Sequence, residues 1–72
     1  MEEVSIRGDV IRLGQLLKLA GVVETGGAIK AFLAAEAVRV NGEPEARRGR
    51  QLRDGDFVEA AGRELRIVAG GP

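Results

Sequence analysis

Residues 37–43 read Ala-Val-Arg-Val-Asn-Gly-Glu, and in this stretch the spacing of apolar residues changes from a helical period to a period of two. Val38 and Val40 are expected to point to one side of a strand while Arg39 points to the other. Asn41 and Gly42 then signal a tight turn, because both residue types tolerate a positive φ angle. The pattern predicts a half-buried strand that presents Arg39 to solvent and ends in a hairpin.

Toward the N-terminus, two short helices are expected before this strand. The first is indicated by apolar residues at helical spacing, namely Leu13, Leu16, Leu17 and Ala20. Gly21 suits its left-handed C-cap, and Thr25 is a good N-cap for the second helix. In that helix the side chains expected to be buried are Ile29, Phe32 and Leu33. Lys30 is expected to stay off the buried face. Ahead of both helices, residues 4–6 alternate as a short strand does.

Toward the C-terminus, the pattern predicts further short strands. Residues 43–45 form a weak return strand that Pro44 confines to a sheet edge. Residues 47–50 are expected to form a loop, and residues 57–60 and 64–68 a last hairpin with Phe57 in the core. Residues 69–72 form a tail. The predicted fold is α+β, with two short helices packed on a small antiparallel sheet in a single domain spanning residues 1–72.

The composition argues against an enzyme. The chain has 72 residues, 44% of them hydrophobic, which allows one small core and hardly an enclosed cleft for a small-molecule substrate. Cysteine and histidine are both absent, which excludes disulfides, cysteine zinc sites and the usual general base. The acidic residues follow no metal-binding spacing. We therefore expect no catalysis, no cofactor and no metal.

The composition also suggests where the protein works. The first residues are acidic, unlike the basic start of a signal peptide. No apolar stretch approaches the roughly 20 residues that a membrane-spanning helix needs. We expect a cytoplasmic protein without a membrane partner.

Charge is balanced overall but unevenly distributed. The formal net charge is +0, with 11 basic and 11 acidic residues. Between residues 39 and 53, however, five arginines stand against two acids: Arg39, Arg47, Arg48, Arg50 and Arg53 against Glu43 and Glu45. A neutral protein with separated charge can present one basic face, which nucleic-acid binding requires.

Two segments are candidates for contact with phosphate. Thr25-Gly26-Gly27 opens the second helix, where free N–H groups and the helix dipole favour an anion and Lys30 adds a charge. The alternative is a plain helix cap in a tight turn. The second candidate is the cluster Arg47, Arg48 and Arg50 with Arg39 on a neighbouring strand. Arginine makes forked bonds to phosphate, although such clusters are often only solvated loops.

The expected ligand is structured RNA. Both phenylalanines are expected in the core, so no exposed aromatic side chain is left to stack on the bases of single strands. The protein is therefore expected to hold RNA mainly through its backbone and shape.

Taken in order, four segments resemble the S-four RNA-binding domain, which is named after ribosomal small-subunit protein four. They are residues 13–21, 25–30, 37–43 and 55–58. The resemblance covers about residues 10–68 and is strongest to the stand-alone bacterial version. It implies two helices on a bent sheet (the alpha-L motif) and RNA contacts from basic residues of the second helix and the nearby strand and loop.

Carried onto this chain, the resemblance and the two candidate segments give one set of RNA-binding residues: Lys18, Thr25, Gly26, Gly27, Lys30, Arg39, Asn41, Arg47, Arg48 and Arg50. Many members have Ser-Arg where Thr25-Gly26-Gly27 stands, so one direct arginine contact is missing here. The partner is expected to be ribosomal or transfer RNA, bound by a monomer that is associated with the ribosome.

Two other functions remain open at this point. Sulfur-carrier proteins of the β-grasp fold share this length, a Val-Asn-Gly-Glu segment, an Asp-Gly-Asp segment and a Gly-Gly end. Their chemistry needs a free terminal glycine carboxylate, and here Pro72 follows Gly71. The other alternative is an adaptor that binds only proteins.

Overall fold

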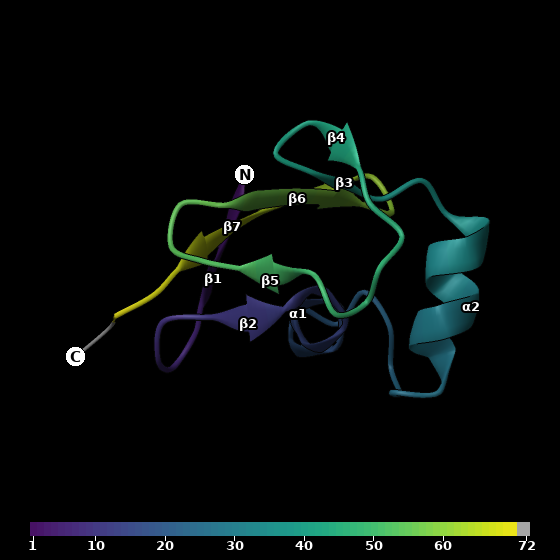
Figure 1. The fold of residues 1–72 in the computed structure, drawn as a ribbon, viewed down its shortest axis with the longest axis horizontal. Helices are drawn as coiled ribbons and strands as arrows, with labels where there is room; N and C mark the ends of the chain where they lie inside the picture. Colours follow the sequence, from purple (N-terminus) through teal and green to yellow (C-terminus); the bar gives the residue numbers. More distant parts are fainter. Residues whose placement is uncertain (71–72) are drawn as a thin grey trace.

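The computed structural model describes residues 1–70, which form two small sheets and two helices (Figure 1). The strands are β1 (Glu2–Ser5), β2 (Ile11–Arg12), β3 (Arg39–Val40), β4 (Glu43–Pro44), β5 (Gln51–Leu52), β6 (Phe57–Ala60) and β7 (Arg63–Val68). The helices are α1 (Leu13–Leu19) and α2 (Ala28–Ala35). Two residues of the expected tail, Gly71 and Pro72, lie outside the described part.

The larger sheet has the order β1-β7-β6-β3-β4. Its pairs are antiparallel except for β1 and β7, which run parallel. The α+β fold with a mostly antiparallel sheet is thus confirmed. The predicted turn after β3 is also confirmed, with φ angles of 51° at Asn41 and 84° at Gly42. The strand containing Pro44 lies at the edge of this sheet, where a residue without an N–H is tolerated.

A second sheet, which the sequence pattern did not predict, pairs β2 with β5. Ile11 stands opposite Leu52, and Arg12 opposite Gln51. Strands of two residues are too short to show a period of two, so only their pairing reveals them. This pairing brings residues 47–50 to the start of α1, as Figure 1 shows for the chain entering β5.

The core contains Leu13, Leu16 and Leu17 of α1 together with side chains from β3, β5, β6 and β7. Within α2, Ile29 and Leu33 are buried as predicted. Phe32, however, is only partly buried, so the prediction of a buried Phe32 was wrong. The physical reason is the position of α2 at one end of the molecule, where only one side of the helix reaches the core (Figure 1).

Phe57 of β6 is likewise only half-buried, which corrects its placement in the core. Its neighbour Val58 occupies the inner face of that strand, and successive side chains of a strand point to opposite faces. On β3 the predicted alternation is confirmed, with Val40 buried and Arg39 exposed.

The ends of the helices differ in how well local sequence predicted them. Gly21 follows α1 with a φ of 75°, and Val22 N–H donates to the Leu17 carbonyl at 2.8 Å, as the Gly21 cap predicted. At the start of α2, Gly27 rather than Thr25 is the N-cap, so that prediction was wrong. The Thr25 carbonyl accepts the Ala28 N–H at 3.1 Å, which means that a tight backbone turn replaces a side-chain cap.

Candidate nucleic-acid interface

The segment from Glu45 to Arg50, here called the arginine loop, connects β4 to β5 and is bonded to the first turn of α1. Leu13 N–H donates to the Arg50 carbonyl at 2.8 Å, and Gly14 N–H donates to the Arg48 carbonyl at 2.9 Å. The first N–H groups of a helix lack partners within the helix. Here the arginine loop accepts hydrogen bonds from two of these groups, those of Leu13 and Gly14, so the backbone of the loop is fixed to the first turn of α1.

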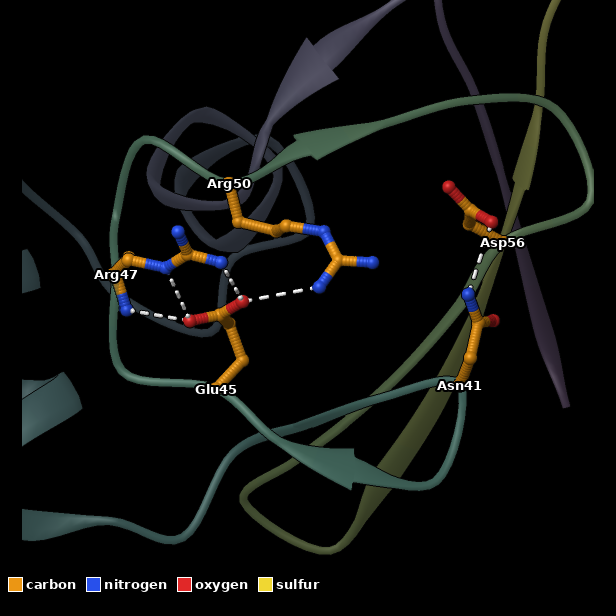
Figure 2. A network of polar contacts seen from close by, with 5 residues as sticks. All are labelled: Asn41, Glu45, Arg47, Arg50 and Asp56. Carbon is orange, nitrogen blue, oxygen red and sulfur yellow. Dashed lines mark hydrogen bonds and ion pairs between the residues drawn. The ribbon is translucent and has the colours of Figure 1, made fainter.

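Glu45 organises two of the three arginines of the loop (Figure 2). Arg47 donates to its carboxylate from the backbone N, Nε and Nη2, each at 3.1 Å. Arg50 donates from Nη1 at 3.1 Å. The Glu45 side chain is only 9% exposed, whereas that of Arg47 is 77% exposed. The guanidinium and backbone N–H of Arg47, together with Arg50, lower the pKa of Glu45 to about 2.

The arginine loop remains positively charged despite the ion pairs with Glu45. Three arginines against one glutamate leave the arginine loop with a net charge of +2. A guanidinium carries five N–H donors. Arg47 uses two of its side-chain donors on Glu45 and Arg50 uses one, so both can still donate to an external acceptor.

Arg48 differs from its neighbours because its side chain forms no hydrogen bond or ion pair with any residue from 1 to 70. It is exposed, and with Lys30 of α2 it lines a shallow groove of about 590 Å³. The remaining lining is apolar: Leu33, Ala34 and Ala46. The fold thus brings together a lysine and an arginine that are far apart in the sequence.

Arg48 also borders a second hollow, on the side of α1. This hollow is lined by Arg12, Gly14, Gln15, Gly26, Ile29, Arg48 and Gly49. A side chain built at Gly26 would meet nothing within 4 Å, so this backbone is open to a ligand. Arg12 was missed in the sequence analysis. Its only local signal is a position before the first helix, and the pairing of β2 with β5 is what brings it here.

The other predicted site residues are spread more widely. Arg39 is exposed on β3 and donates from Nη1 to the Gly42 carbonyl at 3.4 Å, but it does not line the hollows that Arg48 borders. Lys18 is exposed in the last turn of α1, one helical turn beyond Gly14. Thr25 and Gly27 are exposed beside Gly26. Arg47 and Arg50 line a third hollow with Gly49 and Gln51.

The side chain of Asn41 forms two hydrogen bonds within the fold. Its Nδ2 donates to Asp56 Oδ1 at 3.0 Å, and its Oδ1 accepts the Phe57 N–H at 2.9 Å. Figure 2 shows Asn41 and Asp56 facing each other, away from the cluster around Glu45. The side chain thereby ties the turn after β3 to the start of β6.

No group of three or more acidic, histidine or cysteine side chains among residues 1–70 is arranged to hold a metal ion. Neither helix in this part of the chain is long and apolar enough to cross a membrane.

A family model described as S4 domain matches residues 4–68, which is most of the chain. The chain therefore belongs to the S4 (S-four) domain family, whose members usually bind RNA. A relative from Bacillus subtilis (strain 168), named "Probable ribosome maturation protein RlbA", is 52% identical over 59 residues. The match covers 82% of this chain and 83% of the relative, so the two have nearly the same length. The resemblance drawn from the sequence is thereby confirmed.

Proposed function

We propose that this protein binds structured ribosomal RNA through Lys30 and the arginine loop, and that it acts in ribosome maturation without catalysing a reaction. The observation that carries the proposal is the position of Lys30 and Arg48 on one groove, neither with an acidic partner in residues 1–70. In this proposal the protein works in the cytoplasm, as a monomer, and needs no cofactor.

The arrangement of charged side chains supports Lys30 and the arginine loop as the surface that contacts phosphate. Arg48 and Lys30 can bond to phosphate without first breaking an ion pair. Arg47 and Arg50 are held by Glu45 with N–H donors to spare, so little side-chain entropy is lost when they bind. The backbone N–H groups of Gly26 and Gly27, with Thr25 beside them, would donate to a further phosphate oxygen. A side chain built at Gly26 would meet nothing within 4 Å, so a ligand can approach the backbone there.

The remaining residues extend the surface in this proposal. Lys18 and Arg39 contribute charge at its margins, and Arg12 joins through the second hollow. Asn41 acts indirectly, by holding the turn that follows Arg39.

The choice of ribosomal over transfer RNA rests on the name of the Bacillus subtilis relative. Sequencing of the RNA crosslinked to the protein in cells tests this choice. Ribosomal RNA and its precursors should dominate, and an excess of transfer RNA would contradict the assignment.

The binding surface is tested by titrating salt against affinity for ribosomal RNA. The wild-type protein should show a negative slope of log affinity on log salt. Arg48→Glu should weaken binding about tenfold or more and reduce the slope by about one, as loss of a phosphate contact does. The matched control is Arg66→Glu, which makes the same charge change at an exposed position of β7 and should have a much smaller effect. Equal losses in two folded variants would mean that overall charge, and not this surface, determines binding.

A further inference from the structure

The groove between α2 and the arginine loop has a composition that contact with a phosphate backbone alone does not explain. It is lined by two cations, Lys30 of α2 and Arg48 of the arginine loop, and by the apolar side chains of Leu33, Ala34 and Ala46. A regular RNA duplex presents phosphates and ribose at its surface and keeps its bases stacked inside. Apolar side chains combined with two cations in one groove suit a ligand that joins a flat ring face to anionic groups.

We propose that this groove holds one unpaired nucleotide of the bound RNA, with its base against Leu33, Ala34 and Ala46 and its flanking phosphates on Lys30 and Arg48. This inference rests on the proposed RNA-binding function and adds the class of RNA: a helix interrupted by a bulge, loop or junction.

The size and charge of the groove agree with this occupant. Its volume of about 590 Å³ lies within the roughly 300–1,000 Å³ of small-ligand sites. No acidic side chain lines it, so a nucleotide would meet no repulsion there. The apolar part comes from three small or medium side chains, which is enough for one base and not for a series of bases.

Arg48 is suited to contact a base as well as a phosphate. Unpaired bases in protein–RNA complexes stack on aromatic side chains or on the planes of arginine guanidinium groups. Both phenylalanines of this chain are half-buried and neither lines the groove. Arg47 and Arg50 are bonded to Glu45, whereas the Arg48 guanidinium has no bond within residues 1–70 to hold it away from a base.

The test compares two RNA hairpins with the same stem, one fully paired and one with a single-nucleotide bulge carrying 2-aminopurine. The bulged hairpin should bind about tenfold more tightly, in line with base stacking against a protein. The fluorescence of 2-aminopurine should change on binding. Equal affinity for the two hairpins would overturn the inference while leaving the RNA-binding function intact, and the groove would then suit an apolar side chain of a protein partner. Failure to bind either hairpin or ribosomal RNA would overturn the proposed function itself.

Two matched variants locate the effect. Ala34 lines the groove, whereas Ala31, also exposed on α2, does not. Ala34→Leu should remove the preference for the bulge while leaving affinity for the paired hairpin and its salt slope unchanged, because no charge is altered. Ala31→Leu should leave all three unchanged. A bulge preference that survives in Ala34→Leu would show that the nucleotide binds elsewhere and would overturn the proposed location.

Discussion

Two glutamates, Glu2 and Glu45, form ion pairs with arginine in different regions of this domain, and the surroundings of these ion pairs differ. At the edge of the larger sheet, Arg63 donates to Glu2 from Nε at 2.8 Å and from Nη2 at 2.6 Å, and the two side chains are 35% and 50% exposed. In the arginine loop, Glu45 is 9% exposed and accepts from both Arg47 and Arg50. Glu2 and Arg63 are 61 positions apart in the sequence, whereas Glu45 is two positions from Arg47 and five from Arg50.

The difference shows that similar bonds can have different roles. The Glu2–Arg63 pair links β1 to β7, two strands that already pair along their length. The pKa of Glu2 is lowered by the hydrogen bonds from Arg63, but that of Glu45 falls to about 2, since a backbone N–H and a second arginine add to the first. Glu45 therefore fixes the directions of two cations on the proposed RNA-binding surface, while Glu2 fastens a sheet edge.

The largest expected change in stability comes from crowding the close packing of α1 against α2 and the arginine loop. A Cβ at Gly14 would lie 3.3 Å from Ile29 Cγ2 and 3.4 Å from Arg48 Cβ. Gly14→Val should therefore destabilise the fold by about 1–3 kcal/mol through overpacking, with the better helix propensity of valine offsetting only part of this. Urea unfolding measures the change. Gly26→Val is the control, because its site is open and its stability should stay close to that of the wild type. Similar losses in both variants would mean that Gly14 is not closely packed.

Replacing each glutamate by glutamine compares the two directly, with a smaller expected effect on the melting temperature. Glu45→Gln removes the charge that holds Arg47 and Arg50, and the melting temperature should fall by about 4–8 °C if the net loss is worth one hydrogen bond. Affinity for RNA should change little in low salt, because one negative charge is lost while the arginines become less ordered. Glu2→Gln should lower the melting temperature less, since exposed pairs contribute little. A larger fall for Glu2→Gln would reverse the roles assigned to the pairs.

The smallest effect should be the pH dependence of stability. A carboxylate whose folded-state pKa is depressed stabilises the fold above its unfolded pKa, and this contribution is lost as pH falls through the folded pKa. For Glu45 the loss should extend from about pH 4.5 to about pH 2. The difference in melting temperature between the wild type and Glu45→Gln should therefore be full at pH 7 and shrink through this range. A difference that stays constant down to pH 2 would show that the charge of Glu45 is not what stabilises the loop.

Much of the fold was predictable because its signals are local. The alternation around Arg39, the Asn41–Gly42 turn and the Gly21 cap each depend on a few neighbouring residues and their backbone preferences. The burial of Phe32 and the capping role of Thr25 were predicted wrongly for the opposite reason. Which part of α2 meets the core, and how the chain enters that helix, depend on the position of α2 at one end of the molecule.

For the candidate site, composition and order alone indicated a basic surface around residues 39–53 and suggested the family. The contact residues themselves remain predictions. Local sequence could not separate Arg48 from Arg47 and Arg50, because all three lie within four positions of one another. Only the tertiary structure distinguishes them. The short β2–β5 pairing holds the arginine loop against α1, Glu45 engages two of its arginines, and the third shares a groove with Lys30 of α2. Backbone preferences act between neighbours, whereas these arrangements depend on which distant segments meet when the core forms.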